Sequence, residues 1–137
     1  MSKSRVDDYE TEIGKITKTH LGYEGHGILT CGLQMDFGGA GQMVGGYALD
    51  EPIKGHGGIV EDRYGTAFGM EWIRRAMRAG GVESWEELPG RTLYVLRSKE
   101  SPGMKVLGLA PLPTEPGETF IFQELSDEFY PPKQPEK

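Results

Sequence analysis

The stretch Ile-Leu-Thr-Cys-Gly-Leu-Gln-Met-Asp-Phe, at residues 28–37, decides the fold class of this 137-residue chain. Its apolar side chains recur at every second position: Leu29, Cys31, Leu33, Met35 and Phe37. Between them stand Thr30, Gly32, Gln34 and Asp36. A period of two is typical of a strand with one face buried and the other exposed. We therefore expect residues 28–37 to form a strand of a sheet that is covered on one side.

Other segments predict further strands around this one. They are residues 13–22, 42–50, 91–98, 104–109 and 120–125. The glycine-rich turn at 38–41 makes the third segment a hairpin partner of residues 28–37. Gly45 and Gly46 interrupt that partner strand. Glycines inside a strand mark either a bulge or the close approach of another backbone or a ligand, and both interpretations stay open here.

Residues 66–79 predict one long helix, ended by Gly80 and Gly81. The residues at helical spacing that we expect to face the core are Ala67, Met70, Ile73 and Met77. Ser84 and Glu87 match a capping box, which predicts a short second helix. Strands, a helix pair and more strands indicate an α+β fold, with a small antiparallel sheet, one long helix and one short helix. We expect a flexible leader at 1–12, a single domain at 13–129 and a flexible tail at 130–137.

Composition excludes several classes of protein. The formal net charge is −6, which argues against binding to polymeric nucleic acid because such binding needs clustered cations. No apolar run approaches the roughly 18 residues of a membrane span. Residues 1–12 lack the apolar stretch of a signal peptide, so we expect a cytoplasmic protein. Cys31 is the only cysteine, which suits a reducing compartment and a place in the core.

The sequence offers no catalytic or metal-binding motif. The three histidines and the single cysteine do not form a zinc-binding set. The glycine cluster at 38–46 lacks the Gly-Lys-Ser/Thr ending of a phosphate loop, and a strand follows it where a helix is needed. Asp36 and Asp50 flank the hairpin, either as a carboxylate pair or as turn-capping residues. No nucleophile or acid–base set is evident, so we expect no enzyme activity, no cofactor and no metal.

Arginines are the residues best suited to grip a small anion. Six of the seven lie between residues 63 and 97, and a guanidinium suits bidentate phosphate recognition. Arg63 precedes the long helix, where it is either part of an anion site at the helix N-terminus or a solvated loop residue. Arg91 and Arg97 bracket the strand at 91–98 and share its apolar face, so each needs a partner: a subunit interface or a phosphate. The helix arginines suit a solvated face: Arg74, Arg75 and Arg78.

Aromatic residues lie close to these arginines in the sequence: Phe68, Trp72, Trp85 and Tyr94. Aromatic faces stack nucleotide bases, and an arginine adds cation–π attraction. Each of them also suits the core, and this alternative stays open.

Five segments, in order, resemble a known family of phage proteins. They read ITKTHLG at 16–22, EGHGILT at 24–30, GQMVGGYALD at 41–50, GTA at 65–67 with GM at 69–70, and GVESWE at 81–86. Together they resemble the first type of Thoeris anti-defence protein over residues 13–109. The segments at 55–62 and 111–117 look longer than in that family. We therefore do not assign the residues that form the rim of the family's pocket to positions in this chain.

The resemblance implies a sponge that binds and sequesters cyclic ADP-ribose isomers, such as glycocyclic ADP-ribose, without cleaving them. Bacterial TIR-domain enzymes make these signals, and their capture in the host cytoplasm keeps Thoeris immunity inactive. The family forms homo-oligomers, dimers or hexamers, with pockets at subunit interfaces, and some members also hold cyclic oligonucleotides of the CBASS pathway. By analogy, Arg63 matches a phosphate-facing arginine.

The chemistry of the residues and the resemblance together predict one set of ligand-binding residues: Arg63, Phe68, Arg91, Tyr94, Arg97, Gln42, Gly45 and Gly46. Two other classes of function stay open: a hydrolase or lyase that degrades the cyclic nucleotide, and a structural protein of the phage particle.

Overall fold

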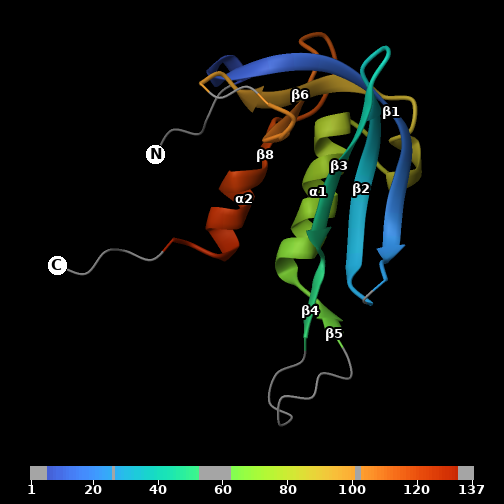
Figure 1. Cartoon of the computed structure of the whole chain (residues 1–137), viewed down its shortest axis with the longest axis vertical. Coiled ribbons are helices and arrows are strands. Elements are labelled where there is room, and N and C mark those ends of the chain that lie inside the picture. Colours follow the sequence, from blue (N-terminus) through green and yellow to red (C-terminus); the bar gives the residue numbers. More distant parts are fainter. Residues whose placement is uncertain (1–5, 26, 53–62, 101–102, 133–137) are drawn as a thin grey trace, which may run out of the picture.

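A six-stranded antiparallel sheet curls around one long helix in the computed structural model (Figure 1). The structure describes residues 6–25, 27–52, 63–100 and 103–132. Across the sheet the strands are β3 (Gly41–Ala48), β2 (Leu29–Asp36), β1 (Tyr9–Tyr23), β6 (Thr92–Ser98), β7 (Gly108–Pro111) and β8 (Phe120–Ile121). A small second sheet pairs β4 (Asp50–Pro52) with β5 (Arg63–Gly65). The helices are α1 (Ala67–Gly80) and α2 (Phe122–Phe129), with 3-10 turns η1 (Val6–Asp8) and η2 (Trp85–Glu87). The predicted α+β class is confirmed.

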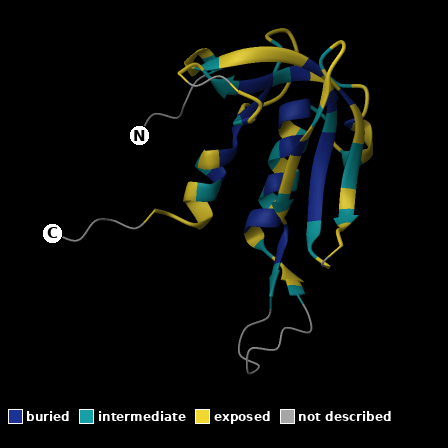
Figure 2. Cartoon of the chain, viewed as in Figure 1, coloured by how far each residue is buried: buried dark blue, intermediate teal, exposed yellow. Residues whose placement is uncertain are grey.

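The strand that decides the fold forms, and its apolar face is buried as predicted, but Thr30 and Gly32 of the face expected to be exposed are buried as well. On β2, Cys31, Leu33 and Met35 are all at most 1% exposed. Figure 2 shows most of β2 and one side of α1 as buried, because these two surfaces pack against each other. Burial raises the pKa of the Cys31 thiol to about 12, which fits the predicted core position.

The first strand is longer than predicted and begins inside the expected leader. Tyr9 to Lys15 pair with β6, and Lys15 to Tyr23 pair with β2, with a register shift between Ile16 and Lys18. The strand bends along its length, so one strand serves both neighbours (Figure 1). Residues 9–12 look polar and loose in the sequence, but they are paired with β6. Residues 1–5 of the leader and 133–137 of the tail lie outside the described residues.

Helix α1 begins and ends where its caps predict. The Thr66 hydroxyl accepts a hydrogen bond from the Gly69 N–H at 2.9 Å. At the other end, Gly81 has φ 67° and its N–H donates to the Arg78 carbonyl at 3.1 Å. Both arrangements satisfy backbone groups that a helix end leaves free.

The predicted core face of α1 is partly wrong: Ile73 and Met77 pack against the core, partly buried, but Ala67 and Met70 are exposed. The buried side chains are Phe68, Trp72, Ala76 and Ala79, whereas Met70 is 60% exposed. Gly69 explains the difference, because a Cβ at this position would lie 2.4 Å from the Leu49 carbonyl oxygen. The helix therefore meets the end of β3 through a bare glycine, and this contact turns Trp72 rather than Met70 toward the sheet.

The C-terminal part also differs from the expectation. The predicted strand at 104–109 forms later, as β7, and the predicted strand at 120–125 is only β8 before the chain turns into α2. The apolar residues at 120–125 also fit a helical spacing, because Phe122 and Leu125 are buried on one side of α2 and Phe129 follows on the same side. The predicted short helix after Ser84 is the 3-10 turn η2; the Ser84 hydroxyl bonds the Glu87 carboxylate, not the backbone.

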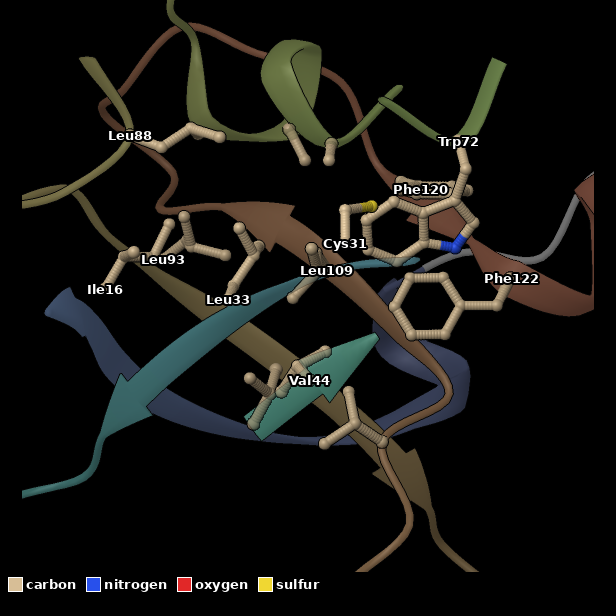
Figure 3. Packing of buried hydrophobic residues seen from close by; sticks show 14 of the residues in the cluster. Ile16, Cys31, Leu33, Val44, Trp72, Leu88, Leu93, Leu109, Phe120 and Phe122 are labelled. Atoms are coloured by element: carbon tan, nitrogen blue, oxygen red, sulfur yellow. The ribbon is translucent and has the colours of Figure 1, made fainter. Parts of the chain in front are cut away.

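An aromatic cluster fills the core between the sheet, α1 and the start of α2 (Figure 3). The Trp72 ring lies 5.4 Å from Phe120, 5.5 Å from Phe122 and 5.9 Å from Tyr47, measured between centroids. Among the helices that the structure describes, none has the length and apolar character of a membrane span.

Candidate functional site

A hollow of about 220 Å³ lies along β3, which is one of the two edge strands of the six-stranded sheet. Its lining comes from β3, the segment before β7 and the start of α2: Gln42, Met43, Val44, Gly45, Tyr47, Lys105, Val106 and Phe122. We call this hollow the β3 seam. β3 is hydrogen-bonded to β2 alone among the described strands, so its outer edge is unpaired at the seam.

Two glycines shape the seam. Gly45 and Gly46 have φ values of 114° and 83°, in the left-handed region that favours glycine. The pairing of β2 with β3 shifts register at this point, so the bulge, one of the two interpretations left open by the sequence, is present. A Cβ on Gly45 would lie 2.8 Å from the Cys31 carbonyl oxygen and 3.2 Å from Trp72 Cη2, whereas one on Gly46 would meet nothing within 4 Å. The bulge thus packs on its inner side and is open on its outer side.

One end of the seam is held by Gln42 and Arg97. The Gln42 amide donates to the Met104 carbonyl at 2.6 Å, and its oxygen accepts from Arg97 at 3.2 Å. Arg97 also donates to the Met104 carbonyl at 2.7 Å and pairs with Glu12 at 3.0 Å. Its guanidinium lies 5.3 Å from the centre of the Phe37 ring. The partner that the sequence requires for Arg97 is therefore supplied within the chain.

The chemistry of the seam is cationic and aromatic. Lys105 is exposed at its rim, and the rings of Tyr47 and Phe122, 5.7 Å apart, form part of its wall. Burial raises the pKa of Tyr47, which keeps its hydroxyl neutral. None of the eight described residues that line the seam is a carboxylate, and Glu12, which reaches the Gln42 end through Arg97, is paired with that arginine.

Two other hollows carry carboxylates among their described residues. One, of about 270 Å³ beside α1, contains Arg74, Arg75 and Arg78 together with Glu71 and Glu118. Its arginines form ion pairs: Arg74 and Arg75 with Glu71, Arg75 with Glu128, and Arg78 with Glu118. The other, of about 550 Å³, is lined by Asp7, Asp8, Glu100 and four further residues. An anionic ligand has to displace or face these carboxylates, which makes the β3 seam the better anion site.

Arg63 lies at the opposite end of β3 from Gln42. Its Nε donates to the Asp50 carboxylate at 3.0 Å and its Nη2 to the Asp50 carbonyl at 3.0 Å. The same carboxylate accepts from the Leu29 N–H at 3.2 Å, so Arg63 and Asp50 fasten β4 and β5 to β2. Asp36 caps its turn by accepting from the Gly38 N–H at 3.0 Å. The two aspartates stand at opposite ends of β2 and do not form a pair.

The remaining predicted residues lie elsewhere. Phe68 is 8% exposed in the core, and Arg91 donates to the Gly80 carbonyl at the end of α1, at 3.0 Å. Tyr94 packs on the opposite face of the sheet, against a second cluster that contains Leu96. The eight predicted residues thus do not form one site within a chain. The seam contains Gln42 and Gly45, with Gly46 next to it and Arg97 bonded to Gln42.

Sequence reasoning missed Tyr47, Lys105 and Phe122. Lys105 is a lone cation in a segment read as strand, and Phe122 belongs to a segment read as an edge strand. Lys105 and Phe122 lie far from β3 in the sequence, which leaves no local signal, and only the curl of the sheet brings them to it.

Comparisons with protein-family models, curated proteins and solved structures found no match. The resemblance to Thoeris anti-defence proteins therefore stays a prediction. Within the described part of the chain, no three His, Cys, Asp or Glu side chains gather as a metal ion requires.

Proposed function

We propose that this protein binds a small cyclic nucleotide of the cyclic ADP-ribose type in the β3 seam and holds it without cleaving it. The observation that carries the proposal is the lining of the seam, which joins Lys105, the Gln42 amide and two aromatic rings beside a bare glycine bulge. A cation suits a phosphate, aromatic rings suit a base, and glycine lets backbone N–H groups approach an anion closely.

The size of the seam calls for a second wall. Pockets that enclose small ligands measure about 300–1,000 Å³, and the seam measures about 220 Å³. A second copy of the chain can supply the wall, because β3 carries no charged residue or proline along its eight residues. Unpaired edge strands of monomers are commonly protected by such residues. We therefore propose a homo-oligomer, and the dimers or hexamers of the resembling family are consistent with it.

The oligomer has its own test. Met43 on β3 is 46% exposed, so Met43→Lys is compatible with a folded monomer and places a charge at the edge. We expect this variant to sediment as a smaller species than wild type, while Met70→Lys, at a 60% exposed position on α1, leaves the size unchanged. A wild-type protein that sediments as a monomer contradicts the two-chain pocket.

Sequestration requires tight binding. A sponge has to compete with the receptor of the signal, which calls for a Kd on the order of nanomolar, or about −12 kcal/mol. In the cytoplasm of a bacterial host, such binding keeps Thoeris immunity inactive. Cyclic oligonucleotides of the CBASS pathway are a second proposed ligand class, by the resemblance alone.

The experiment is capture and release. The protein is mixed with cyclic ADP-ribose, the protein-bound fraction is separated and heat-denatured, and the released material is chromatographed. Recovery of unchanged ligand supports the proposal. A cleaved product makes the protein an enzyme, and an absence of capture refutes ligand binding.

A matched pair of variants tests the seam itself. Lys105→Glu reverses the charge at the rim, and Lys18→Glu makes the same change on an exposed position of β1. We expect capture to fall for the first variant and to persist for the second, with both proteins as stable as wild type. Equal capture by both variants places the ligand outside the seam.

A further inference from the structure

The indole N–H of Trp72 is buried without a hydrogen-bond partner. Trp72 is 0% exposed, and its Nε1 is the one buried side-chain polar atom among the described residues that lacks a partner. Leaving a buried donor unsatisfied is costly, and native proteins contain few such groups. A buried orphan donor therefore calls for a reason.

The position of this donor points toward the seam. Three residues that line the seam pack against Trp72: Gly45, Tyr47 and Phe122. Figure 3 shows Nε1 on the side of the indole that is turned away from Cys31 and toward Phe122. The centres of the Trp72 and Phe122 rings are 5.5 Å apart. Phe122 thus contacts both Trp72 and the seam.

We infer that Trp72 Nε1 is the hydrogen-bond donor that recognises the base of the bound nucleotide, after the Phe122 ring moves aside. The inference rests on the proposed function. It adds that the base is the part of the ligand that is buried most deeply. Phe122 is the first residue of α2, and the bond from its N–H to the Leu107 carbonyl, at 3.0 Å, anchors its backbone. Its ring is 5% exposed and packs against Tyr47, Trp72 and Phe120, so the inference requires this ring to rotate while the backbone of β8 and α2 stays in place.

The surroundings of the donor select the chemistry of its partner. Two titratable residues that share the core cluster with Trp72 are Tyr47 and Cys31, and burial raises the pKa of both, so both are neutral. A phosphate entering this apolar region loses its hydration without gaining a counter-charge. A flat, uncharged base with an acceptor in its plane loses far less, and it can stack on the Tyr47 ring once Phe122 has moved aside. The phosphates then remain at the rim, near Lys105 and Gln42.

Such a donor gives specificity as well as affinity. A site that hydrogen-bonds one group of its ligand strongly rejects analogues that lack this group, because the buried donor stays unpaired. We therefore expect the base, and not only the charge of the ligand, to decide which cyclic nucleotide is held.

The test compares the two tryptophans of the chain. Trp72→Phe keeps an aromatic ring and removes the N–H, and Trp85→Phe makes the same change on η2, away from the seam lining. With cyclic ADP-ribose as the probe, we expect Trp72→Phe to weaken capture about tenfold or more, the factor that corresponds to 1.4 kcal/mol. We expect Trp85→Phe to capture like wild type, and both variants to retain the wild-type oligomer.

A second measurement covers the case in which Trp72→Phe folds poorly. In Trp85→Phe, Trp72 is the remaining tryptophan, so its fluorescence reports on the donor alone. Saturating cyclic ADP-ribose should shift this emission to longer wavelength as the N–H gains an acceptor. Equal capture by the two variants, or an emission that the probe leaves unchanged, overturns the role of Trp72 while the proposed function stands. Absence of capture by the wild-type protein refutes the proposed function, and the inference falls with it.

Discussion

Replacing Gly45 with alanine should destabilise the protein far more than the same change at Gly46. Both positions have positive φ, so alanine meets backbone strain of about 1–2 kcal/mol at each. Gly45 adds a packing cost, because its new Cβ would lie 2.8 Å from the Cys31 carbonyl oxygen and 3.2 Å from Trp72 Cη2. Overpacking of this kind costs about 1–3 kcal/mol. The expected losses are thus about 2–5 kcal/mol for Gly45→Ala and about 1–2 kcal/mol for Gly46→Ala.

Urea unfolding measures both losses, since the midpoint falls while the slope with denaturant stays constant. The difference between the variants isolates the contact of the bulge with Cys31 and Trp72, because backbone strain is shared. We also expect Gly45→Ala to shift the Trp72 ring and weaken ligand capture. Two variants of equal stability would refute the packed bulge and with it the described shape of the seam.

Three further predictions concern Cys31, Glu71 and the pair of Arg63 with Asp50. Because burial raises the pKa of Cys31 to about 12, a thiol reagent should label the native protein slowly and at a rate that follows unfolding as urea is added; fast labelling without urea contradicts this burial. The hydrogen bond from Arg74 lowers the pKa of Glu71 below its ordinary value of 4.5, so its contribution to stability is present above that value and is lost as the pH falls through the folded-state pKa. Glu71→Gln should therefore flatten the acid side of the stability curve, and an unchanged acid side argues against the bond. Arg63→Ala leaves the 5% exposed Asp50 carboxylate with the Leu29 N–H and should cost about 2–4 kcal/mol, less than a fully buried pair because Arg63 is 22% exposed. Adding Asp50→Asn should restore part of this loss in thermal unfolding, and a stable Arg63→Ala contradicts the structural role of the pair.

The parts of the fold that sequence reasoning predicts are those with a local physical cause. The alternation on β2 follows from one buried face, and it holds at Cys31 and Leu33. The ends of α1 follow from the Thr66 cap and from the left-handed conformation of Gly81. Each of these signals lies within a few residues of the structure that it determines.

The parts that could not be predicted depend on contacts between distant segments. The contact between Gly69 and the backbone of Leu49 decides which face of α1 turns inward. The spacing of Met70 and Met77 in the sequence does not indicate this contact. The start of β1 looks like a loose leader until β6 pairs with it. Helix α2 is hidden in an apolar run that also suits a strand.

The candidate site divides in the same way. Gly45 and Gly46 stand out in the sequence because a glycine pair inside a strand signals a bulge. Lys105 and Phe122 reach the seam only because the sheet curls, so no spacing in the sequence predicts that they line it. Arginines that look available in the sequence find partners within the fold, as Arg97 does with Glu12.

Amide NMR spectra recorded with and without cyclic ADP-ribose test the central claim most directly, because each backbone N–H reports on its own position. We predict that the largest shifts fall on the β3 seam, at Gly45, Gly46 and Tyr47, and at Lys105 across from them. Shifts centred on the arginines of α1, or spectra that the ligand leaves unchanged, would contradict a ligand held in the seam.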